Sequence, residues 1–154
     1  MAAKVDLKRF NNSWYKPGKG RIILLLWYII NALVFNSYLL PFNKVKVYLL
    51  RLFGARVGKG VVIKPKVNIK YPWKLTIGDF SWIGEEVWID NLAEVKIADN
   101  CCVSQGAMLL TGNHDYKKAT FDLMVGEIML QSGTWVGVKS VVCLRVTLHK
   151  NALI

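Results

Sequence analysis

The 154-residue chain contains few of the residues that usually bind a metal ion or form a disulfide framework. It has two histidines and three cysteines; Cys101 and Cys102 are adjacent and Cys143 is far away, so no zinc-ligand spacing is present. An odd number of cysteines gives no disulfide framework and favours a reducing compartment. We therefore expect no metal ion and a cytoplasmic location.

Acidic residues are almost missing from the first 60 positions, where Asp6 stands against eleven lysines and arginines, a net charge of +10. Residues 61–154 carry ten basic and nine acidic residues, a net charge of +1. A basic segment can bind nucleic acid or an anionic membrane surface. Because its basic residues do not alternate with aromatic ones, we expect a membrane surface as the partner and no nucleic acid.

The same N-terminal part contains a long apolar run without charge. Between positions 22 and 40, sixteen of nineteen residues are apolar, which approaches the ~20 residues of a bilayer-spanning helix. Asn31, Asn36 and Ser37 interrupt the run and weaken a lipid-spanning helix. Residues 1–56 therefore form a basic, apolar helical segment in our interpretation. It lies on a membrane, packs on the domain or a sister subunit, or spans the bilayer.

From Val57 an aliphatic residue recurs every six positions. The repeats form four runs of eighteen residues each, at 57–74, 77–94, 97–114 and 130–147. A fixed period is a signal of repeat architecture, and a period of six with turns predicts short strands folding around a prism. We expect residues 57–154 to form about four such coils with the leading aliphatic residues inward. Gly58, Gly78, Gly84 and Gly137 would relieve crowding or permit unusual backbone angles at turns.

Residues 57–153 resemble the hexapeptide-repeat acyltransferases, and the stretch at 71–116 resembles most closely the colanic acid and related exopolysaccharide O-acetyltransferases. The resemblance implies a mainly β fold, a left-handed parallel β-helix that assembles as a homotrimer. It implies acetyl transfer from acetyl-CoA to a sugar hydroxyl, on a sugar or a lipid-linked oligosaccharide. The reaction would take place in the bacterial cytoplasm, at the inner face of the cytoplasmic membrane.

His114 is the candidate general base. It ends the third run, in TGNHDY, and residues 115–129 then interrupt the repeat. Histidine suits proton transfer near neutral pH, and a histidine at the mouth of a projecting loop is well placed for chemistry. In the family that the chain resembles, the histidine of this motif takes the proton of the acceptor hydroxyl. The second histidine, His149, is interpreted as a turn residue.

Five further residues are candidates for ligand contacts. Asp90 and Asn91, in WIDN, lie one coil before His114 and are either acceptor contacts or turn formers. By resemblance, Trp135 lies beside the acceptor and the thioester arm of acetyl-CoA, although packing between coils would explain it equally well. Gly137 and Val138 follow it and are expected at the acetyl-CoA site.

The C-terminal part departs from the family pattern. Residues 144–149 lack the usual turn-forming Pro-Gly pair, and Arg145 and His149 stand where small residues would keep the corner tight. Relatives continue for further coils beyond position 154, so we expect a truncated β-helix whose last coil, 130–147, exposes an apolar face. The alternative to an active enzyme is a catalytically weak or inactive structural solenoid of the same family.

Overall fold

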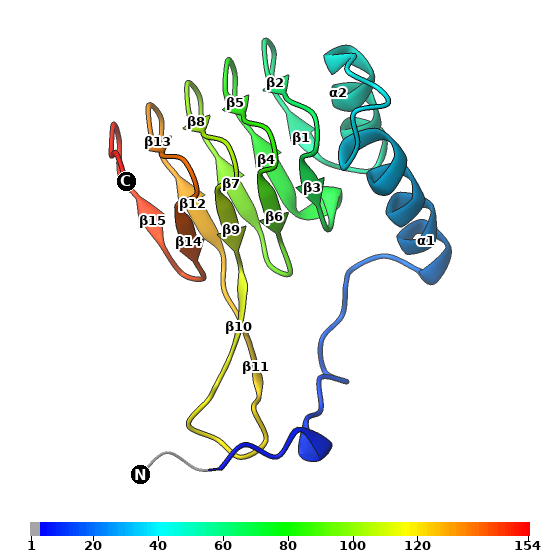
Figure 1. The fold of residues 1–154 in the computed structure, drawn as a ribbon, viewed down its shortest axis with the longest axis vertical. Coiled ribbons are helices and arrows are strands. Elements are labelled where there is room, and N and C mark those ends of the chain that lie inside the picture. Colours follow the sequence, from blue (N-terminus) through cyan, green and yellow to red (C-terminus); the bar gives the residue numbers. More distant parts are fainter. Residues whose placement is uncertain (1–3) are drawn as a thin grey trace.

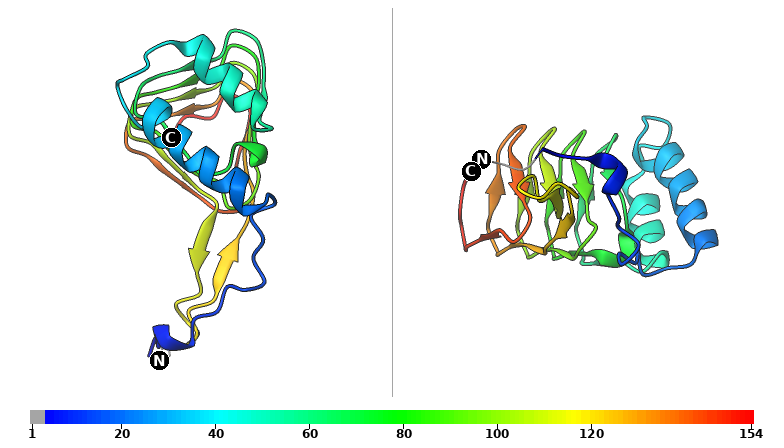
Figure 2. Two further views of the ribbon diagram at one scale, coloured as in Figure 1. Left: turned by 90° about the vertical axis from the view of Figure 1, so that its right-hand side faces the viewer. Right: turned by 90° about the horizontal axis from the view of Figure 1, so that it is seen from below.

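The computed structural model describes residues 4–154, which form a prism of parallel strands with two helices at one end (Figures 1 and 2). Three parallel sheets form its sides. Sheet A contains, in spatial order, β1 (Arg56–Val57), β4 (Leu75–Ile77), β7 (Val95–Ile97), β12 (Ile128–Leu130) and β15 (Thr147–Leu148). Sheet B contains β13 (Trp135–Val136), β8 (Cys102–Val103), β5 (Trp82–Ile83) and β2 (Val62–Ile63). Sheet C contains β14 (Val141–Cys143), β9 (Met108–Leu110), β6 (Trp88–Asp90) and β3 (Asn68–Ile69).

The register of these sheets follows the sequence repeat. Val57 pairs with Ile77 and Ile77 with Ile97, so each coil places an aliphatic residue directly over the previous one. The leading residues of the first four coils are buried, and they form one continuous apolar core. The predictions of a mainly β fold and of parallel strands are confirmed.

The corners of the prism share one backbone feature. Except at Pro72, Leu92 and Gly112, the fourth residue of each hexapeptide adopts a left-handed conformation, and where it is not glycine φ lies between 55° and 64°. Arg145, with φ 64°, is one of these residues, and Lys66 and Lys139 adopt the same conformation at the corner between sheets B and C. The sequence pattern placed Arg145 where a small residue would keep the corner tight. In the structure its side chain is exposed and its amide donates to the carbonyl of Glu127 at 2.9 Å, so this corner is hydrogen-bonded to the neighbouring segment despite the long side chain.

Gly78 and its counterparts Gly58 and Gly84 serve a different purpose. None of the three has a positive φ. A Cβ atom on Gly78 would lie 2.6 Å from the backbone nitrogen of Asp99 in the next coil, and Gly58 and Gly84 are as close to their neighbours. These glycines relieve crowding between coils, which was one of the two roles that we expected.

The N-terminal helices cover the first coil. They are α1 (Arg21–Ile30), a π-helical turn η2 (Asn31–Phe35) and α2 (Asn43–Leu52). Trp27, Phe35 and Leu50 are buried against the coil and join the core. Part of the apolar run thus packs on the domain. Within residues 4–154, no helix is both long and apolar enough to cross a bilayer.

Side chains from these helices also complete the exposed strand edges of the first coil. Arg51 donates to the carbonyl of Val57 in sheet A. In sheet B, Asn43 accepts from the amide of Ile63 at 2.7 Å. In sheet C, Asn31 accepts from the amide of Ile69 at 3.1 Å. An unpaired backbone group at a strand edge costs free energy when it is buried, and it can pair with another chain when it is exposed. One polar side chain for each sheet satisfies such a group at this end of the prism.

At the opposite end, residues 147–154 continue the winding. Strand β15 pairs with β12, and Leu153 forms a parallel bridge with Trp135. The amide of Trp135 donates to the carbonyl of Ala152 at 2.8 Å. The expectation of a bare last coil is therefore wrong for sheets A and B, where these residues lie over the coil at 130–147.

Candidate functional site

A β-hairpin projects from the prism at the interruption of the repeat (Figure 1). Its strands are β10 (Gly112–His114) and β11 (Leu123–Val125), antiparallel, with His114 opposite Leu123. The winding resumes with β12, in which Leu130 pairs with Ile97 as the repeat predicted, and Ile128 pairs with Val95. The hairpin therefore leaves the coil stack undisturbed and carries His114 away from the core.

The imidazole of His114 is fixed by contacts on both sides. Its Nδ1 lies 3.0 Å from the carbonyl oxygen of Phe121, and the Phe121 ring stacks on it with centroids 4.4 Å apart and planes 4° apart. The ring of Phe10 meets it edge-on at 5.3 Å. Because a carbonyl oxygen only accepts hydrogen bonds, Nδ1 carries the proton, and the lone pair of the neutral ring is on Nε2.

A hollow of about 580 Å³ lies beside His114. Its other walls come from the hairpin, from the turns after β3 and β6, and from the N-terminal residues that precede α1. They are Phe10, Asn12, Ser13, Tyr15, Pro17, Lys70, Tyr71, Leu92 and Leu123. We call residues 6–17 the N-terminal strap. The sequence analysis placed residues 1–56 on a membrane, against the domain or a sister subunit, or across the bilayer, and it missed the place of the strap beside His114. The aromatic residues at positions 10, 14 and 15 of an otherwise polar stretch were the available signal.

Tyr15 anchors the strap at the floor of the hollow. Its hydroxyl donates to the carbonyl of Leu92 at 2.8 Å and accepts from Lys74 Nζ at 3.0 Å. Burial, together with the nearby Tyr71 and Asp90, raises the pKa of Tyr15 far above its usual range. Burial also lowers the pKa of Lys74. Tyr15 therefore stays a neutral hydrogen-bond donor at every physiological pH.

Asn91 forms the turn below this hollow. Its side chain is fully buried, accepts from the amide of Tyr71 at 2.9 Å and donates to the carbonyls of Tyr71 and Lys74. Both ends of the amide are thus occupied by backbone. Of the two roles that the sequence left open, the structure shows the turn-forming one, and it corrects the expected acceptor contact at Asn91.

Asp90 faces a second hollow, of about 620 Å³, beneath α1. Its carboxylate lies 2.8 Å from Lys70 Nζ as an ion pair, although Oδ1 has no partner in hydrogen-bond geometry. Lys70 and Tyr71 line both hollows. The structure therefore places Asp90 next to the hollow of His114, behind these two side chains, rather than in it.

Trp135, Gly137 and Val138 lie elsewhere in the chain. Trp135 is in sheet B, 52% exposed, and its indole nitrogen donates to Ser104 Oγ at 2.8 Å. Gly137 donates its amide to the carbonyl of Ile154, and Val138 is exposed. None of the three lines the hollow of His114, and the hairpin points away from β13 (Figure 1). One chain does not bring them together with His114.

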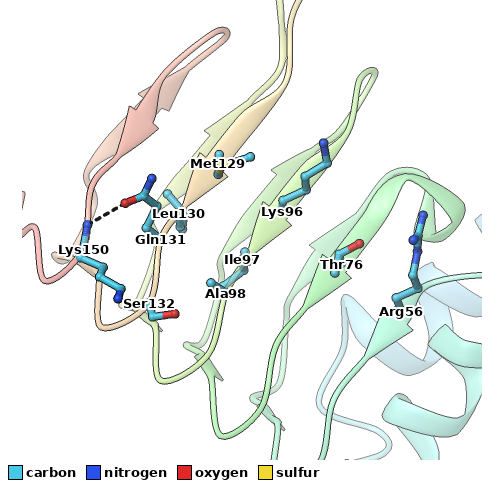
Figure 3. Close-up of a pocket in the computed structure, with 10 residues that line it drawn as sticks. All are labelled: Arg56, Thr76, Lys96, Ile97, Ala98, Met129, Leu130, Gln131, Ser132 and Lys150. Atoms are coloured by element: carbon cyan, nitrogen blue, oxygen red, sulfur yellow. Dashed lines mark hydrogen bonds between the residues drawn. The ribbon is translucent and has the colours of Figure 1, made fainter.

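A third hollow, of about 600 Å³, lies on the outer face of sheet A (Figure 3). Arg56, Lys96 and Lys150 make it basic, and Met129 gives it an apolar floor. None of the described residues that line it carries an imidazole, thiol or carboxylate, so these residues offer no general base. Within the described part of the chain, no three histidine, cysteine or acidic side chains are grouped so that they could hold a metal ion.

Parallel sheets wound with a six-residue period, and one inserted hairpin that carries a histidine beside a hollow, agree with the hexapeptide-repeat architecture that the sequence resemblance implied. No profile of a known protein family matches the chain. It is 35% identical over 149 residues to WcaF of Escherichia coli strain K12, named as a colanic acid biosynthesis acetyltransferase, covering 97% of this chain and 82% of WcaF. The namesake from Shigella flexneri gives the same values. The chain belongs to the family of the colanic acid biosynthesis acetyltransferases.

Solved structures share the fold at low sequence identity. The hexapeptide-repeat acetyltransferase VCA0836 of Vibrio cholerae superposes with a TM-score of 0.75 at 17% identity, over 88% of this chain and 78% of that one. Its complex with acetyl coenzyme A gives 0.73 at 16% identity, over 86% and 72%. A maltose O-acetyltransferase of Clostridium difficile gives 0.59 at 12% identity, over 86% and 73%.

Proposed function

We propose that this protein transfers an acetyl group from acetyl-CoA to a sugar hydroxyl in the biosynthesis of a colanic acid-like exopolysaccharide, with His114 as general base. Family membership supports the reaction class. The observation that carries the role of His114 is its contact with the Phe121 carbonyl, which leaves Nε2 as the basic nitrogen beside a hollow.

The reaction then needs two proton transfers, one from the acceptor hydroxyl to His114 and one from His114 to the leaving thiolate. Nε2 of His114 takes the proton of the acceptor hydroxyl while that oxygen attacks the thioester carbonyl. The tetrahedral intermediate collapses with cleavage of the C–S bond, and the imidazolium returns the proton to the sulfur of coenzyme A. The Phe121 carbonyl stabilises the imidazolium and holds the ring in one orientation.

The active assembly in this proposal is a homotrimer of left-handed β-helices. Its support is the separation within one chain of His114 from Trp135, Gly137 and Val138. A second subunit would supply these three residues as the acetyl-CoA site opposite His114. The complex of VCA0836 with acetyl coenzyme A supports the same co-substrate.

The N-terminal helices are proposed to dock on an anionic membrane, at the cytoplasmic face in bacteria. Ile22, Leu25, Leu26 and Ile29 have the spacing of one helix face, and they are 76%, 61%, 46% and 46% exposed. Ten net positive charges in the first 60 residues would add attraction to anionic headgroups. An amphipathic helix of this kind lies in the membrane interface.

The decisive experiment is acetyl-CoA binding by calorimetry together with transfer of radiolabelled acetyl to a polysaccharide precursor extract. We expect binding and transfer in the wild type, and binding without transfer in a His114→Asn variant. A wild-type protein that binds no acetyl-CoA would contradict the proposal and favour the inactive structural solenoid.

A further inference from the structure

We propose that the N-terminal strap, with Lys70 and Tyr71, forms the binding site for the acceptor, and that the acceptor presents a neutral pyranose ring to it. This inference rests on the proposed function. It gives the first residues of the chain a role in substrate recognition that is separate from membrane docking.

The composition of the hollow points to a sugar. Phe10, Tyr15 and Tyr71 supply three aromatic rings, and the faces of such rings attract the polarised C–H bonds on the apolar side of a pyranose. Asn12 and Ser13 add exposed polar side chains that can exchange hydrogen bonds with ring hydroxyls. An apolar floor with a few polar groups at its edge is typical of small-molecule sites.

The charge of the hollow argues for a neutral ring rather than a phosphate group. Among the residues that the structure describes, Lys70 is the only lysine or arginine that lines it, and its ammonium group lies 2.8 Å from Asp90 Oδ1. A phosphate site would need further cations or a cluster of free backbone amides.

The strap is attached along its length to the part of the chain that carries His114. The amide of Asp6 donates to the carbonyl of Ala119 at 2.8 Å in the hairpin loop. Tyr15 bonds to Leu92, and the indole nitrogen of Trp73 donates to the carbonyl of Pro17 at 2.7 Å. These contacts place the acceptor site and the base in the same chain, where a bound hydroxyl would lie next to Nε2.

The test uses the full chain and a panel of methyl pyranosides of common hexoses and deoxyhexoses, with binding measured by saturation-transfer NMR. We expect at least one pyranoside to bind the wild type. Tyr15→Leu removes a ring face and should raise the Kd at least tenfold. Tyr48→Leu is the matched control, because it makes the same substitution at an exposed tyrosine of α2 that does not line the hollow; its Kd should stay within twofold.

A second variant covers the case in which loss of the Tyr15 hydroxyl releases the strap. The side chain of Asn12 is exposed and makes no hydrogen bond to the described residues, so Asn12→Ala leaves the strap anchored. We expect it to raise the Kd about threefold or more. The inference would be overturned if no pyranoside bound the wild type, or if the pyranosides bound Tyr15→Leu and Asn12→Ala as tightly as the wild type.

Acetyl transfer to the bound pyranosides separates this inference from the proposed function. Binding that depends on Tyr15, without any transfer from acetyl-CoA, would support the sugar site and contradict the proposed reaction. Transfer with an acceptor KM that is unchanged in Tyr15→Leu would support the reaction and contradict the sugar site.

Discussion

Replacing His114 by asparagine separates its role as a base from its contacts in the hairpin. The side-chain amide of asparagine can donate to the Phe121 carbonyl from nearly the position of Nδ1, but it has no basic nitrogen. General-base catalysis contributes about 10²–10⁴-fold. We therefore expect kcat to fall by that factor, which corresponds to about 3–5 kcal/mol in the activation barrier.

The same substitution should cost the fold little. The imidazole contacts Phe10 and Phe121 in a half-buried hairpin outside the core, and each aromatic contact contributes about 0.5–1.5 kcal/mol. We expect the free energy of unfolding to fall by about 1–2 kcal/mol, with an unchanged KM for acetyl-CoA.

The assay is release of coenzyme A thiol in the presence of acceptor, with unfolding followed by circular dichroism in urea. His149→Asn is the matched control, because His149 is exposed and contributes only its carbonyl to hydrogen bonds. It should keep kcat within twofold. If His114→Asn also kept kcat within threefold while folded, His114 would not be the base and the mechanism would be refuted.

Three further predictions concern the fold and the membrane. Asn91→Ala should lower the free energy of unfolding, measured by urea titration, by about 2–4 kcal/mol. The reason is that the amide of Tyr71 and the carbonyls of Tyr71 and Lys74 lose their partner. An unchanged free energy of unfolding would contradict the structural role of Asn91. Gly78→Ala should cost about 1–3 kcal/mol, because its Cβ would clash with the backbone of the next coil. Gly20→Ala meets nothing within 4 Å and should cost under about 1 kcal/mol, so equal losses would contradict the crowding argument. Leu25→Asp should weaken co-sedimentation with anionic phosphatidylserine vesicles, and added salt should weaken it further in the wild type; binding that neither change alters would exclude docking through α1.

Several corrections have one physical cause. For Asn91 the sequence left an acceptor contact and a turn-forming role open, and for Arg145 it indicated a position suited to a small residue; both interpretations considered the residue type alone. The structure shows that the neighbours decide: the amide of Asn91 is enclosed by the turn at 71–74, whereas the side chain of Arg145 extends into solvent. A polar residue in a turn motif does not reveal from sequence whether it faces a ligand or the backbone.

The six-residue period determined the parallel strands, the inward aliphatic residues, the twenty-residue register and the position of the His114 insertion. It could do so because each coil repeats the same local pattern and buries the same positions. Only the tertiary structure showed that Phe10 contacts His114 and that Tyr15 lines the same hollow. It also showed that Asn31, Asn43 and Arg51 close the strand edges, and that Trp135 lies on another face. Contacts between segments so distant in the chain depend on its path through space, and no periodic pattern in the sequence records that path.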